Sequence, residues 1–124
     1  MSYPVKISLD SHVRGDRWPG IPTIGPVTIN GVQPSSALTR IRAQFRSPRR
    51  GVFTLDSDDV GDRDAPIIIG NATTWEASVP EVVDFLPEVG DWSWDMEFYQ
   101  AGVDGPRTFY HGVLTVTPDI TRPA

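Results

Sequence analysis

The strongest constraint on the fold is an alternating stretch that is followed by a second apolar run near the C-terminus. From position 92 to 99, apolar and polar side chains take turns, a period of two that is typical of a strand with one buried face. The apolar set is Trp92, Trp94, Met96 and Phe98. A glycine- and proline-containing turn at 101–106 separates this stretch from the run 108–117. Strands joined by so short a loop pair antiparallel, so we expect a long hairpin on which the remaining strands pack.

A second alternating stretch, residues 39–46, predicts a strand with basic residues on one face. Its apolar side is expected to hold Thr39, Ile41, Ala43 and Phe45. Its polar side holds Arg40, Arg42, Gln44 and Arg46, of which the three arginines are called the arginine stripe below. Arg49 and Arg50 follow in the next turn. Since arginine makes bidentate bonds and is enriched at protein interfaces, these five arginines form a candidate protein-docking face.

The rest of the chain is divided into short segments by glycine and proline. Further short strands are expected at 3–9, 27–29, 52–55, 67–69 and 74–79, an irregular connection at 19–26, and one helical turn within 80–90. The total is about seven to nine strands, at the spacing expected of a sandwich. The sequence therefore predicts an all-β fold, an immunoglobulin-like antiparallel β-sandwich of short strands, with residues 1–124 forming one domain.

Composition argues against several classes of protein. The 124 residues carry a formal net charge of −5, which disfavours binding to nucleic acid. The absence of cysteine excludes disulfides and thiolate zinc sites. No apolar run reaches the length of a membrane span, and the N-terminus lacks the pattern of a secretory signal. We expect no nucleic acid or membrane as partner.

Asp95 and Glu97 are the candidate catalytic pair. On one face of a strand their carboxylates would lie roughly 7 Å apart, within the range of glycosidases. Ion pairing with arginines of a neighbouring strand explains the same two residues and is the favoured interpretation. No catalytic residue is predicted, and we expect the protein not to be an enzyme.

The acidic segment 56–64 has some of the oxygen ligands of an EF-hand loop. The template fails because Val60 and Ile67 stand where ligands are needed. The two histidines, His12 and His111, belong to no metal-ligand spacing. Neither a metal nor another cofactor is expected.

The four tryptophans offer a different kind of site. Trp75, Trp92 and Trp94 alternate with other apolar residues and are expected in the core. Trp18 stands beside Pro19 in an irregular segment, so we expect it to be exposed and name it the candidate ligand-stacking residue. It motivates an alternative function, a carbohydrate-binding module that recognises glycans of a host surface.

Several motifs occur in a fixed order along the chain. They are the step Arg14-Gly15-Asp16-Arg17-Trp18, the Asn30-Gly31 turn, the strand 38–46, the strand Trp92-Ser93-Trp94-Asp95-Met96-Glu97-Phe98, and an ending with Thr108, Gly112 and the run 114–122. In this layout the chain resembles small β-sandwich proteins and N-terminal domains encoded among the tail, baseplate and fibre genes of bacteriophages and prophages, over about residues 13–122.

The resemblance implies a virion structural protein, most often a tail, baseplate or tail-fibre adaptor component that acts by docking on other proteins. It implies other virion proteins as partners, several copies in each assembly, and a location in the virion after assembly in the host cytoplasm. Capsid decoration is the alternative within the same class. The family supplies no catalytic residues to transfer to this chain.

Overall fold

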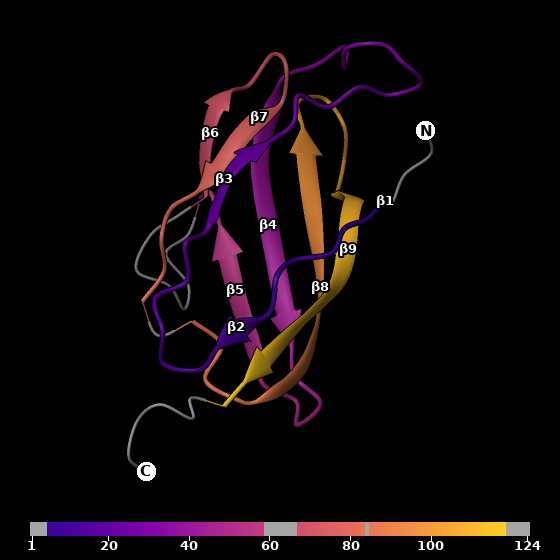
Figure 1. The fold of residues 1–124 in the computed structure, drawn as a ribbon. Helices are drawn as coiled ribbons and strands as arrows, with labels where there is room; N and C mark the ends of the chain where they lie inside the picture. Colours follow the sequence, from indigo (N-terminus) through magenta and orange to yellow (C-terminus); the bar gives the residue numbers. More distant parts are fainter. Residues whose placement is uncertain (1–4, 59–66, 84, 119–124) are drawn as a thin grey trace.

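The computed structural model describes residues 5–58, 67–83 and 85–118, which form nine strands in two sheets (Figure 1). The larger sheet holds β1 (Val5–Lys6), β2 (His12–Val13), β4 (Leu38–Arg46), β5 (Val52–Asp56), β8 (Gly90–Gln100) and β9 (Arg107–Thr117). The smaller sheet holds β3 (Ile21–Ile24), β6 (Ile68–Asn71) and β7 (Glu76–Val79). The two sheets pack together around one apolar core, so the predicted all-β sandwich is confirmed.

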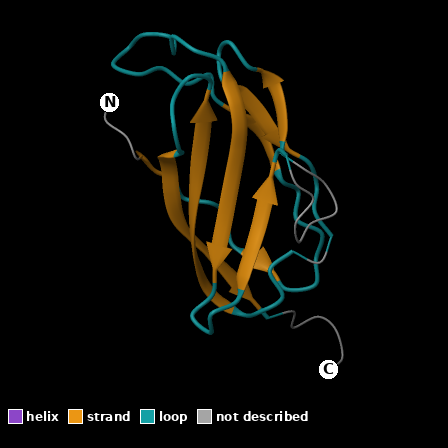
Figure 2. Cartoon of the chain, turned by 180° about the vertical axis from the view of Figure 1, so that it is seen from behind, coloured by secondary structure: helices purple, strands orange, loops and turns teal. Residues whose placement is uncertain are grey.

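The strand order is that of an immunoglobulin-type sandwich. The smaller sheet runs β3-β7-β6, which corresponds to strands B, E and D, and β5-β4-β8-β9 corresponds to C′, C, F and G. Figure 2 views the molecule from behind, with the larger sheet nearest the reader and no helix among the described residues. Accordingly, no helix in the described part of the chain could span a membrane.

The predicted hairpin is the centre of the larger sheet. Strands β8 and β9 are each eleven residues long and pair antiparallel, with Trp94 opposite Gly112 and Trp92 opposite Leu114. The long hairpin expected from the sequence is therefore confirmed. Strand β4 pairs with the other side of β8 and places Phe45 opposite Trp94. The alternate residues predicted to face inward on β8 are all buried.

Aromatic rings fill the space between the sheets. Trp75, Trp92 and Trp94 are at most 4% exposed, as predicted. The indole Nε1–H of Trp92 donates to the Glu88 carbonyl oxygen at 2.9 Å. This bond lies at the start of the F-equivalent strand, where the tyrosine corner of immunoglobulin domains makes a similar bond back to the chain. It fixes the connection that enters the hairpin.

The structure of the N-terminal region differs from several of the sequence-based predictions. Residues 5–13 form only two short strands, and both pair parallel with β9, so the larger sheet is not wholly antiparallel. The proline-rich segment 19–26 contains edge strand β3, whereas residues 27–29 form no strand and contribute a single bridge from Ile29 to Val32. Proline is compatible with an edge because one side of an edge strand needs no ladder partner. Gly112 accommodates the N-terminal segment, since a Cβ there would lie 2.2 Å from the Ile7 carbonyl oxygen.

Two smaller expectations are also wrong. No helical turn is present in the described part of 80–90, where Val82 instead bridges to Trp18 (Asp84 lies outside the described residues). Thr39 is exposed and Leu38 is buried in its place. A register shift between Leu38 and Arg40 explains the exchange, because a bulge inverts the alternation on one side of it.

Candidate docking face

The outer face of the larger sheet, meaning the side turned away from the smaller sheet, carries the arginine stripe. Strand β4 presents Arg40, Arg42, Gln44 and Arg46 there, as predicted. Its neighbour β8 presents Asp91, Ser93, Asp95, Glu97 and Tyr99. A basic row and an acidic row therefore lie side by side, about 4.8 Å apart. Figure 2 looks toward this face.

Arg40 and Asp56 form the most buried ion pair of the outer face. Arg40 Nε donates to Asp56 Oδ1 at 2.9 Å, and its Nη2 contacts the second oxygen. The Asp56 side chain is 3% exposed. Burial alone raises the pKa of this carboxyl, but the hydrogen bonds from Arg40 and from the Asp58 backbone N–H outweigh burial, so the pKa of Asp56 is lowered. The Arg40 guanidinium also lies 5.2 Å from the centre of the Tyr99 ring.

Two further ion pairs connect β4 to β8. Arg42 Nη2 lies 3.4 Å from Glu97 Oε1, and Arg46 Nη1 donates to Asp95 Oδ2 at 3.1 Å. The side chains of these four residues are between 21% and 47% exposed, so the pairs lie at the surface. Arg46 also donates to the Gln44 side-chain oxygen, which holds its guanidinium along the strand. The predicted pairing of Asp95 and Glu97 with the arginine stripe is confirmed.

This pairing accounts for the two candidate catalytic carboxylates. Each is turned toward its own arginine, and neither lines the apolar cavity described below. The arrangement is suited to fixing charges at a surface.

Arg49 and Arg50 lie in the turn that joins β4 to β5, beyond the last paired residues of these strands. Both are exposed, and Arg50 adopts a left-handed backbone conformation with φ of 69°. Among the described residues neither forms an ion pair. They follow the basic row of β4 in the sequence.

Trp18 is not the exposed residue that the sequence suggests. It is 5% exposed and stacks on Phe85, with ring centres 4.1 Å apart. Its backbone N–H donates to the Val82 carbonyl oxygen, and its carbonyl accepts from the Val82 N–H. The connection from β7 to β8 thus covers this tryptophan, and the expectation of a ligand-stacking Trp18 is wrong. All four tryptophans belong to the core.

No group of three or more metal-ligating side chains occurs among the described residues. Of the acidic segment, Asp56 and Asp58 contact Arg40, while Asp59–Asp64 lie outside the described ranges. His12 is buried against Phe85, with ring centres 5.6 Å apart, and burial lowers its pKa. His111 lies on β9 opposite Asp95.

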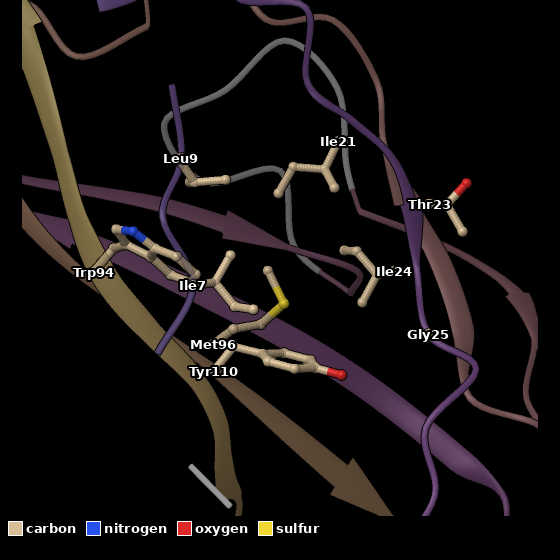
Figure 3. Close-up of a pocket in the computed structure, with 9 residues that line it drawn as sticks. All are labelled: Ile7, Leu9, Ile21, Thr23, Ile24, Gly25, Trp94, Met96 and Tyr110. Atoms are coloured by element: carbon tan, nitrogen blue, oxygen red, sulfur yellow. The ribbon is translucent and has the colours of Figure 1, made fainter. Parts of the chain in front are cut away.

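An apolar cavity that no sequence pattern indicates opens between β3 and the N-terminal segment (Figure 3). It measures about 190 Å³. Its lining includes Ile7, Leu9, Ile21, Ile24, Met96 and Tyr110. These residues come from segments distant in the sequence, so only the folded chain brings them together. Among the described residues no charged side chain lines the cavity, and Thr23 and Tyr110 are the lining residues with a hydroxyl group.

No family model, no curated protein and no solved structure matches this chain.

Proposed function

We propose that this protein is a structural component of a bacteriophage virion, most specifically a tail, baseplate or tail-fibre adaptor that acts by docking on other proteins. The observation that carries the proposal is the open outer face of the larger sheet, with its adjacent basic and acidic rows. The ordered motifs from Arg14 to Arg122 supply the link to phage structural proteins.

The outer face has properties that suit docking. Arg40, Arg42 and Arg46 are held in ion pairs, so these three arginines lose less side-chain entropy when a partner binds than free side chains would. Fixed charges also select a partner, because a wrong partner places like charges together. The face spans four consecutive strands, β5, β4, β8 and β9.

Glycan recognition has less support. Sugar binding by stacking needs an exposed aromatic face, and each of the four tryptophans is at most 5% exposed. The residue that motivated this function, Trp18, stacks on Phe85 in the core. We therefore propose no carbohydrate-binding role.

Electron microscopy of virions labelled with an antibody against this protein tests the proposal. The particles come from the strain whose genome encodes the chain. Label in a fixed ring at the tail end is the expected result. Unlabelled virions would overturn the proposal, and label spread over the capsid would replace the tail role with head decoration.

A pair of matched variants tests the role of the outer face in the same particles. Arg42→Glu should abolish or strongly reduce incorporation into virions, because it places a negative charge within the basic row. Arg17→Glu is the control, since Arg17 also forms an ion pair, with Glu81 at 2.8 Å, but lies outside the face. Equal incorporation of both variants would show that the outer face is not the docking surface.

A further inference from the structure

The outer face is complementary to itself. The strand register places side chains from β5, β4, β8 and β9 at common levels across the sheet. The first level reads Val52, Arg46, Ser93, Val113; the second reads Thr54, Gln44, Asp95, His111; the third reads Asp56, Arg42, Glu97, Thr108. Each level thus has a basic or amide residue on β4 and a polar or acidic residue on β8.

Two copies can face each other about a two-fold axis that runs parallel to the strands, in the contact plane above the boundary between β4 and β8. Rotation about this axis brings the outer face of the second copy against the outer face of the first. The rotation places β4 of one copy over β8 of the other and leaves each level opposite itself. Arg42 then faces Glu97 of the second copy, and Gln44 faces Asp95. At the edge of the contact, Val52 faces Val113, and these two valines are 51% and 46% exposed in the single chain.

We propose that the outer face binds the same face of a second copy of this chain about that two-fold axis. The inference rests on the proposed docking role and names the partner. An isologous contact of this kind is the commonest way in which identical chains associate. The alternative two-fold axis, perpendicular to the strands, would stack Arg42 on the basic row of the second copy and is disfavoured by repulsion.

The charge distribution supports a second copy as the occupant. The chain as a whole carries a net charge of −5, which would repel an identical chain at random orientations. The outer face is close to neutral by comparison. It sets Arg40, Arg42 and Arg46 against Asp56, Asp91, Asp95 and Glu97. The acidic surplus therefore lies mostly elsewhere, and this face is where two copies can approach with opposite charges in register.

The area of the outer face determines how strongly two copies are expected to associate. With strands about 4.8 Å apart and a rise of about 3.4 Å per residue, the contact covers roughly 450 Å² per copy. A stable complex buries about 800 Å² per partner, so we expect a weak dimer with a Kd of about 10 μM or higher. Such a contact becomes effective when neighbouring copies are already held in one assembly.

Reversing the charges at positions 42 and 97, which face each other across the two-fold axis, tests the proposed contact. We would measure the association of the full chain by sedimentation velocity at concentrations up to about 1 mM, for the natural sequence, Arg42→Glu, Glu97→Arg and an equimolar mixture of the two variants. Each variant alone should associate at least about tenfold more weakly, because like charges then face each other across the axis. The mixture should return to within about threefold of the natural chain, because each variant supplies the charge that the other needs.

Restoration in the mixture separates docking from folding. Both variants lose the internal pair between Arg42 and Glu97, so a purely structural role predicts two weakened proteins whose mixture is no better. A mixture without restoration, or a natural chain that stays monomeric up to about 1 mM, would overturn the inference. In either case, label at the tail end of virions would leave the proposed function standing with a different partner.

Discussion

The two faces of the larger sheet are built from alternate residues of the same strands, and they differ in what they contribute. On β4, Phe45 is 1% exposed on the inner face, whereas the side chain of the next residue, Arg46, is 47% exposed on the outer face. The inner face removes aromatic surface from water, which is the main source of folding free energy. The outer face holds surface ion pairs, which contribute little to stability. We infer that the inner face stabilises the fold and that the outer face is available for recognition.

The largest predicted effect lies on the inner face. Trp92→Ala should lower the free energy of unfolding by about 3–5 kcal/mol, because it removes a ring that is 1% exposed and leaves a cavity. Urea denaturation followed by circular dichroism measures this change. Trp92→Phe keeps most of the buried ring and loses the hydrogen bond to the Glu88 carbonyl oxygen, so it should cost less. Equal losses for the two variants would contradict the assignment of stability to burial.

Asp56 differs from the other charged residues of the outer face because its side chain is buried. It therefore tests whether burial, and not the face on which a residue lies, determines its contribution to stability. Asp56→Asn should cost about 2 kcal/mol, since Arg40 loses a charged partner. The lowered pKa of Asp56 means that its contribution is present above the ordinary value of 3.8 and is lost as pH falls below that value. Denaturation curves between pH 3 and 7 should therefore converge for variant and natural chain at the acidic end. A constant difference at every pH would be evidence against the ion pair.

The pH dependence of stability tests whether the buried His12 side chain can carry a charge in the folded protein. Burial lowers its pKa, with Asp16 and a backbone bond to Phe85 acting in the opposite direction. The unfolded chain then binds a proton more readily, so stability should fall as pH drops below the ordinary value of 6.5. His12→Gln should flatten this dependence between pH 7 and 5, because the variant has no imidazole to protonate. An unchanged pH profile in the variant would show that His12 is not responsible.

The smallest effect is expected for the exposed pair of Arg46 and Asp95. A double-mutant cycle with both residues changed to alanine should give a coupling energy below about 0.5 kcal/mol, because both side chains are substantially exposed to solvent. A stability coupling above about 1 kcal/mol would mean that the outer face contributes to folding after all.

Sequence patterns predicted the parts of the fold that depend on local alternation. Strands β4 and β8 each have a long period-two pattern, and the exposed stripe of β4 follows directly from it. Strand β9 was predicted from its apolar run and the short turn before it. The parallel pairing of His12 with Val116 and the burial of Trp18 by Phe85 both depend on contacts between distant segments. Local residues such as Pro19 indicate only an irregular chain, so these features could not be derived from the sequence.

The residues that β4 and β8 contribute to the candidate docking face could be predicted from the sequence, whereas the contribution of β5 could not. The arginines of β4 and the acidic residues Asp95 and Glu97 of β8 follow from the sequence pattern. Asp56 instead falls in the acidic segment 56–64, outside the strand predicted at 52–55. Its position on β5 opposite Arg42, and its bond to Arg40, follow from the register of a strand pair. The levels shared by four strands are likewise a property of the sheet and not of any single segment.

The most direct test of the proposed contact between the outer faces of two copies is a cross-linking measurement. The chain contains no cysteine, so Val52→Cys and Val113→Cys each introduce a single reactive thiol. Facing sheets pack roughly 10 Å apart, so a bismaleimide of that span suits the contact. A mixture of the two variants should give much more covalent dimer than either variant alone, because Val52 of one copy faces Val113 of the other. Equal yields from the mixture and from Val113→Cys alone, or no dimer in any sample, would contradict the proposed face-to-face contact.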